Sequence, residues 1–271
     1  MPTPEPDPLR ERSPFLFWLF GWYLRWYFWR NFDAVRIDLA GPPLLPAGRP
    51  VILFTNHPSW WDPALFILLS NTRLRGRIGF GPMEAEALGK YGLLRRMGAF
   101  GIQLDNPRGA ARFLAVSARV LSDPRAALWV TAEGHFTDSR TRPVRLRPGI
   151  AHLARRNPGA VLVPMAVEYG FWNERRPEAL VRFGPPITGG GERSVAEWGA
   201  VLEAALTDTM DALAAASATR DPRRFELVAR GSGGVGGIYD LWRRLRAWRS
   251  GERARLRHED SPAEVAREPI R

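Results

Sequence analysis

The sequence predicts an α/β domain with a mixed sheet flanked by helices. Short apolar segments of β-type residues alternate with segments of helical periodicity, which is typical of strands connected by helices. Hydrophobic residues make up 45% of the chain and charged residues 25%, so a fibrous or disordered protein is excluded. A chain of 271 residues can bury a sizeable core without disulfides, and this one has no cysteine.

The N-terminal 32 residues divide into two segments. Residues 1–14 contain five prolines with charges between them, which predicts a disordered tail. Residues 15–32 hold 11 of the 30 aromatic residues, with tryptophans at helical spacing: Trp18, Trp22, Trp26 and Trp29. Arginines interrupt this segment before it reaches the roughly 20 apolar residues of a bilayer span. We therefore expect a membrane-interface helix at 15–32; the alternative is an aromatic helix that docks on the protein core.

Residues 33–218 carry the alternating pattern and form the expected α/β domain. We expect strands at 33–39, 51–55, 128–132, 161–168 and 180–183. We expect helices at 63–70, 107–121, 149–156 and 194–216. Ser194 and Glu197 have the spacing of a capping box, which marks the start of the last helix.

Residues 219–271 differ in composition and are expected to form a C-terminal extension. Glycines between 231 and 237 indicate a flexible hinge. The apolar residues of the following basic amphipathic helix share one face: Ile238, Leu241, Trp242, Leu245 and Trp248. Such a helix is typical of a membrane surface, and packing on its own domain is the alternative. The glycines also fit G-x-G-x-x-G, but only 35 residues follow Gly236, too few to complete a dinucleotide-binding sheet.

The chain is strongly basic, with 39 basic and 28 acidic residues. Such a charge attracts polyanions, either nucleic acid or an anionic membrane surface. Aromatic residues and arginines gather in the helices expected at the two ends, which favours the membrane lipid surface, and no nucleic acid partner is expected. With four scattered histidines and no cysteine, no metal site is expected.

The segment 51–69 carries the residues best suited to chemistry. A buried strand runs into Asn56 and His57, a turn follows, and Asp62 stands before Pro63 at the expected cap of a helix. His57 and Asp62 meet only if the turn folds back, because five residues of a continuous helix would separate them by about 140°. A histidine held by a carboxylate is suited to be a general base. The alternative is that Asp62 only caps the helix and His57 is a turn residue.

The wider pattern around these residues resembles a known family. Asn56-His57-Pro58-Ser59-Trp60-Trp61-Asp62 is similar to the N-H-x-S-x-x-D block of the lysophospholipid acyltransferase family, which includes the 1-acylglycerol-3-phosphate acyltransferases. Segments that resemble the later blocks follow in the family's order: 98–102, 127–134, 147–154, 161–167 and 181–187. The resemblance covers residues 33 to 215. The first block is specific, and the others gain weight from their order.

The resemblance implies a glycerolipid acyltransferase-like fold and an O-acyltransferase activity. His57 is then the base that activates an acceptor hydroxyl, and Asp62 is its orienting partner. The other implied site residues contact the substrate: Asn56, Ser59, Glu133, Gly134, Arg108 and Arg140. The acyl donor is a thioester, acyl-coenzyme A or acyl carrier protein, and no cofactor is implied. The acceptor is lysophosphatidate or a related lysolipid.

Two positions depart from the family's usual pattern. The second block usually ends in an arginine where this chain has Leu104, and the third usually ends in an arginine where it has Phe136. The family's arginines are associated with the acceptor's phosphate. Either a nearby arginine substitutes, Arg108, Arg140 or Arg142, or the acceptor is a lipid without glycerol phosphate.

We therefore expect a membrane-associated O-acyltransferase, peripheral or monotopic on the inner face of the cytoplasmic membrane, since no targeting signal is visible. A catalytically inactive relative that only binds membranes is one alternative, because both arginines are replaced. A nucleic-acid-binding protein is another, favoured only by the net charge.

Overall fold

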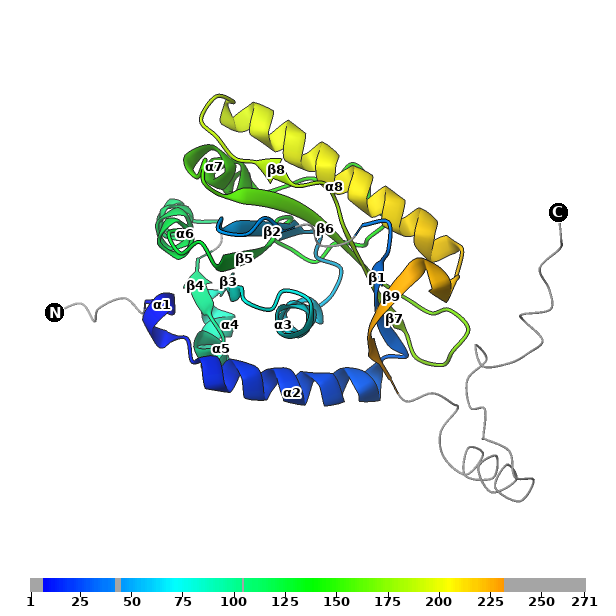
Figure 1. Ribbon diagram of the computed structural model, residues 1–271. Helices are drawn as coiled ribbons and strands as arrows, with labels where there is room; N and C mark the ends of the chain where they lie inside the picture. Colours follow the sequence, from blue (N-terminus) through cyan, green and yellow to red (C-terminus); the bar gives the residue numbers. More distant parts are fainter. Residues whose placement is uncertain (1–6, 42–44, 104, 232–271) are drawn as a thin grey trace, which may run out of the picture.

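A mixed sheet runs through the centre of the computed structural model, which describes residues 7–41, 45–103 and 105–231 (Figure 1). The strand order in this described part is β4-β3-β5-β2-β6-β7-β1-β9, and β8 pairs with β6. The bounds are β1 Ala34–Asp38, β2 Val51–Thr55, β3 Ile78–Glu84, β4 Ala99–Ile102, β5 Ala126–Thr131, β6 Val161–Gly170, β7 Glu178–Phe183, β8 Ile187–Thr188 and β9 Phe225–Arg230. The five strands from β4 to β6 are parallel, β7 is antiparallel to β6, and β9 is antiparallel to β1.

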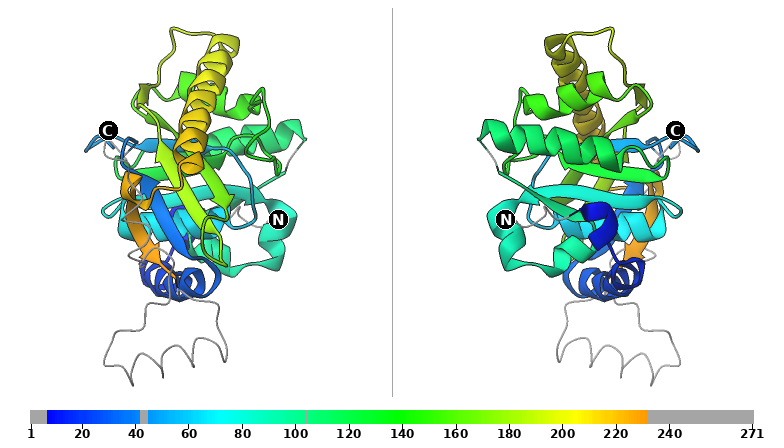
Figure 2. Two further views of the ribbon diagram at one scale, coloured as in Figure 1. Left: turned by 90° about the vertical axis from the view of Figure 1, so that its right-hand side faces the viewer. Right: turned by 90° about the vertical axis from the view of Figure 1, so that its left-hand side faces the viewer.

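Helices cover both faces of the sheet (Figure 1). One face carries α6 Pro107–Val120, α7 Pro148–Arg156 and α8 Val195–Ala218, and the other carries α3 Asp62–Thr72 with α2 Pro14–Asn31 outside it. Figure 2 shows the same separation of α8 from α2 on opposite sides of the molecule. Shorter helices lie near the β3 and β4 edge: α1 Pro8–Glu11, α4 Ala85–Lys90 and α5 Leu93–Arg96.

The two faces of β2 supply two separate cores. Ile52 and Phe54 belong to the cluster under α6, α7 and α8, whereas Val51 and Leu53 belong to the cluster with α3 and α2. Alternation arises because successive side chains of a strand point to opposite faces. Since both faces are covered, all four residues are apolar and buried, as expected for a parallel sheet.

The contact between α2 and α3 is close. A Cβ atom added at Gly21 would lie 2.4 Å from Asn71 Nδ2, so the glycine permits this approach. The buried residues of α2 follow one face: Phe17, Gly21, Leu24 and Phe28. The four tryptophans are on its other side and are exposed by 48% to 68%. The core-docking alternative therefore holds for one face of α2, while the aromatic face stays open.

The predicted α/β class with a mixed sheet is confirmed, and the predicted strands lie within two residues of β1, β2, β5, β6 and β7. Neither β3 nor β4 was expected, because glycines, a proline or short length weaken their strand pattern. The α/β domain also extends past its expected end at 218, because β9 pairs with β1.

The prediction of a disordered tail over 1–14 is wrong for the described residues 7–14. Asp7 caps α1 by accepting a hydrogen bond from the Leu9 N–H at 3.2 Å. Arg12 Nε donates to the Gly79 carbonyl at 3.3 Å, and the Ser13 N–H donates to the Arg96 carbonyl at 2.9 Å. These contacts order a proline-rich segment whose composition alone predicts disorder. The predicted hinge beyond Gly231 and the predicted C-terminal helix lie outside the described residues.

Candidate active site

The candidate site lies where β2 ends, and Asn56 fixes the chain there. Asn56 is fully buried; its Nδ2 donates to the Val167 carbonyl at 2.9 Å, and its Oδ1 accepts from the Val167 N–H at 2.8 Å. The side chain therefore continues the pairing of β2 with β6 beyond the last paired residue of β2, Thr55. This bond pair holds the backbone that enters His57.

The turn after His57 folds back and brings two sequence-predicted residues together. His57 Nδ1 lies 2.6 Å from Asp62 Oδ2. The Ser59 N–H donates to the same carboxylate oxygen at 3.3 Å, and Ser59 Oγ accepts from the Trp61 N–H at 3.3 Å. Pro63 at the second position of α3 favours the helix start directly after this turn.

The expectation that Asp62 is the helix cap is wrong. Helix α3 begins at Asp62 itself, Trp61 occupies the cap position, and no side chain caps the helix. The Asp62 carboxylate points instead to His57, because the turn between them folds back over the helix start. The alternative in which Asp62 only caps a helix is therefore excluded.

Asp62 is completely buried, and its second oxygen has a partner that the sequence analysis missed. Tyr169 on β6 donates its hydroxyl to Asp62 Oδ1 at 2.8 Å. Burial raises the pKa of Asp62, and this effect outweighs the lowering by the hydrogen bonds from His57 and Tyr169. Burial and the neighbouring Asp62 carboxylate raise the pKa of Tyr169 well above its ordinary value, so the hydroxyl remains a donor. No local signal marks Tyr169, because 107 positions separate it from Asp62.

The loop after β5 holds the backbone of His57 on both sides. Glu133 is buried, and its Oε2 accepts from the His57 N–H at 2.7 Å, while the Thr137 N–H donates to the His57 carbonyl at 3.0 Å. Burial raises the pKa of Glu133, more than its hydrogen bond with His57 lowers it. Gly134 follows with φ +73°, and a Cβ there would lie 2.3 Å from Arg147 Nε. The structure thus places Glu133 against the His57 backbone.

The geometry leaves one nitrogen of His57 for chemistry. An ionised carboxylate only accepts hydrogen bonds, so Nδ1 carries the proton shared with Asp62 and Nε2 carries the lone pair. The ring of Phe136 lies 4.4 Å from the His57 ring, centroid to centroid, and is 60% exposed. A hydroxyl that approached Nε2 could give up its proton there, as in general-base catalysis. The His57 ring therefore has an apolar ring as its neighbour.

The arginines considered in the sequence analysis are not joined to this pair by a hydrogen bond. Arg108 is exposed in the first turn of α6, and Arg140 pairs with Asp138 at 2.7 Å. Arg142 Nε donates to Asp211 at 2.9 Å. An arginine that the sequence analysis did not single out, Arg147, lies beside Gly134 and pairs with Asp105 at 2.6 Å. Leu104 lies outside the described residues.

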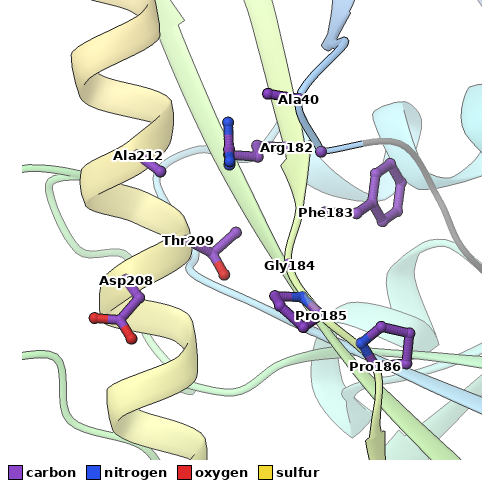
Figure 3. Close-up of a pocket in the computed structure, with 10 residues that line it drawn as sticks. Ala40, Arg182, Phe183, Gly184, Pro185, Pro186, Asp208, Thr209 and Ala212 are labelled. Carbon is purple, nitrogen blue, oxygen red and sulfur yellow. The ribbon is translucent and has the colours of Figure 1, made fainter.

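A separate pocket of about 340 Å³ lies between α8 and the end of β7 (Figure 3). Its wall includes Arg182, Pro185 and Asp208. The register pairs Phe183, at this end of β7, with Met165, whereas Tyr169 pairs with Ala179 near the other end. Met165 also pairs with Thr55 of β2, so the pocket is level with the end of β2, but it borders α8, whereas Asp62 begins α3 on the other face of the sheet.

The described residues contain no group of three or more histidines and carboxylates that could hold a metal ion. Within residues 7–41, 45–103 and 105–231, no helix combines the length and the apolarity that a membrane span requires.

The fold and the site define a class of protein. The model of the family described as Acyltransferase matches residues 36–168, which include β2, the His57 turn, Glu133 and most of β6. Residues 36–168 are therefore similar to the acyltransferase domain of the family that contains the 1-acylglycerol-3-phosphate acyltransferases, and this match supports acyl transfer as the activity. Among curated proteins, none matches the chain.

Proposed function

We propose that this protein is a membrane-associated O-acyltransferase that moves a fatty acyl group from a thioester donor to a hydroxyl of a lysolipid or related lipid acceptor. The donor is acyl-coenzyme A or acyl carrier protein. The observation that carries the proposal is the 2.6 Å contact of His57 Nδ1 with Asp62 Oδ2 inside an acyltransferase domain. Four groups support that contact from the surrounding structure: Asn56, Ser59, Glu133 and Tyr169.

The reaction follows from the protonation states of the pair. His57 Nε2 takes the proton of the acceptor hydroxyl as its oxygen attacks the thioester carbonyl carbon, and Asp62 stabilises the imidazolium that forms. The tetrahedral intermediate collapses, the carbon–sulfur bond breaks, and the leaving thiolate takes the proton from Nε2. The ester product and the free thiol account for all atoms. A thioester is already activated, so positioning and deprotonation are sufficient without a covalent enzyme intermediate.

The exposed side of α2 supports a lipid surface as the partner. Besides the four tryptophans it carries three further exposed large hydrophobic residues: Phe15, Leu19 and Tyr23. Tryptophan and tyrosine favour the headgroup level, and the exposed Arg25 and Arg30 suit anionic lipids. Such a patch is larger than scattered surface hydrophobic residues explain. This surface supports a membrane as the partner, and the inner face of the cytoplasmic membrane is part of the proposal.

Phe136, which lies beside His57, indicates which kind of acceptor the site suits. Phe136 stands where the family resemblance implies an arginine, and its ring contacts the His57 ring. Arg140 and Arg142 are paired with carboxylates, and Arg147 is paired with Asp105. These features favour an acceptor that is recognised near its reactive hydroxyl by apolar contact, such as a hydroxylated lipid without a phosphate monoester.

The test is acyl transfer by the purified full chain, measured by mass spectrometry. The chain is offered acyl-coenzyme A or acyl carrier protein with a panel of lysophospholipids and other hydroxylated lipids in vesicles. We expect a new ester with wild type, none with His57→Ala, and an unchanged yield with His152→Ala, which removes a histidine on α7. If folded, vesicle-bound wild type forms no ester from any pair, the protein is instead a non-catalytic membrane-binding relative.

A further inference from the structure

The inner face of α2 contacts both structural neighbours of Asp62. Trp61 directly precedes Asp62, and its ring lies 5.0 Å from Tyr27, 5.6 Å from Phe28 and 4.8 Å from Phe32, between ring centroids. The Phe32 ring also lies 5.8 Å from the ring of Tyr169, the residue that donates to Asp62. Phe32 is 2% exposed. One buried ring at the end of α2 therefore contacts the residues on both sides of the carboxylate.

We propose that Phe32 is a positioning residue of the His57 and Asp62 pair, which acts through Trp61 and Tyr169. This inference rests on the proposed function of that pair. Helix α2 then has two roles on two faces: the exposed tryptophans bind lipid, and the buried end of the helix orients the carboxylate. The second role does not depend on lipid.

The geometry explains why Phe32 matters. Asp62 has its two oxygens bonded to His57 and Tyr169, so a rotation of its carboxylate disturbs both bonds together. The Trp61 and Phe32 rings meet edge to face at 84°, a favoured aromatic arrangement that limits how Trp61 can move. Loss of the Phe32 ring leaves space beside Trp61 and beside Tyr169. Misplacement of catalytic groups by about 1 Å can lower a rate about a hundredfold.

The variant that tests this is Phe32→Leu, and the matched control is Phe17→Leu. Phe17 is also a buried phenylalanine, but it lies in the first turn of α2, next to Arg12, whereas Phe32 directly follows the last residue of α2. The two variants remove a buried ring from opposite ends of the same helix, so a general loss of packing affects both. Trp61→Phe serves as a second variant if Phe32→Leu does not fold, and thermal unfolding checks the fold of each protein.

Two measurements report on the His57 and Asp62 pair. The first is kcat and KM on a short-chain acceptor that dissolves as a monomer, so that lipid binding has no part in the result. We expect Phe32→Leu to lower kcat by about ten- to a hundredfold with little change in KM, and Phe17→Leu to retain the wild-type kcat. The second is the far-downfield proton NMR signal of the His57 Nδ1 proton, assigned by its loss in His57→Ala. We expect this signal to move or disappear in Phe32→Leu and to stay in Phe17→Leu.

The proposal is overturned if Phe32→Leu and Trp61→Phe are folded and keep both the wild-type kcat and the wild-type proton signal. Equal losses in Phe32→Leu and Phe17→Leu also overturn it, because they indicate general packing. If wild type forms no ester at all, the proposed function fails by itself. The NMR comparison still decides whether Phe32 positions the pair.

Discussion

The Tyr169 hydroxyl occupies the oxygen of Asp62 that His57 leaves free, at 2.8 Å. Strand β6 continues to Gly170, whereas its neighbour β2 ends at Thr55, and the extra length of β6 places Tyr169 beside the start of α3. Both oxygens of this completely buried carboxylate are therefore hydrogen-bonded. Buried polar groups that have all their hydrogen-bond partners make the surrounding structure more rigid.

Replacement of Tyr169 by phenylalanine tests this hydrogen bond. The bond lowers the pKa of Asp62 against the raising effect of burial, so its loss should raise that pKa further. Since the proposed base needs an ionised Asp62, the acid limb of kcat against pH should move to higher pH in Tyr169→Phe. We expect kcat at neutral pH to fall by about fivefold, which corresponds to one net hydrogen bond of about 1 kcal/mol. An unchanged acid limb contradicts this role of Tyr169.

Substitution of Asp62 by asparagine separates stability from activity. Because burial raises the pKa of Asp62 above its ordinary value of 3.8, stability from the bound proton is present below that value and is lost as the pH rises through the folded pKa. An amide has no charge to desolvate. Asp62→Asn should therefore gain stability relative to wild type as the pH rises above 3.8 and through the raised folded pKa of Asp62, while acyl transfer falls. Urea unfolding at several pH values measures the difference, and a difference that does not change with pH argues against the prediction.

Asn56→Ala should destabilise the fold. It leaves the buried N–H and carbonyl of Val167 without the partners that Asn56 supplies, at a cost of about 2–4 kcal/mol. Asn157→Ala is the control, because Asn157 makes only a local side-chain bond to the Leu153 carbonyl. Chemical denaturation gives both free energies of unfolding. Equal losses in the two variants would show that Asn56 has no special structural role.

Gly134→Ala should damage the turn behind His57. The φ of +73° at Gly134 is unfavourable for alanine by about 1–2 kcal/mol, and the added Cβ displaces the Arg147 side chain. We expect a lower thermal midpoint and lower activity, because Glu133 in the same turn holds the His57 N–H. Gly159→Ala is the control, since nothing lies within 4 Å of a Cβ there and its φ is ordinary. A Gly134→Ala protein with wild-type stability contradicts the expectation.

Local sequence was sufficient for much of the fold. The continuous apolar runs of β2 and β6 and the capping box at Ser194 are signals within a few residues, and each lies where it was predicted. Strand β3 was missed because Gly79, Gly81 and Pro82 break the pattern of a strand that its neighbours stabilise. The sequence analysis also did not predict that the α1 segment is ordered, because a distant contact stabilises it: Arg12 donates to the carbonyl of Gly79 in β3.

The sequence by itself determined the α/β class, the turn that carries His57 and Asp62, and the aromatic helix before them, because periodicity, proline and spacing act locally. Only the tertiary structure decided that Asp62 faces His57 and not the helix end, that Glu133 holds the His57 backbone from 76 positions away, and that Tyr169 completes the pair. It also decided which face of α2 is buried against α3 and Trp61. These contacts depend on strand register and helix packing, which join residues far apart in the chain and leave no pattern near either partner.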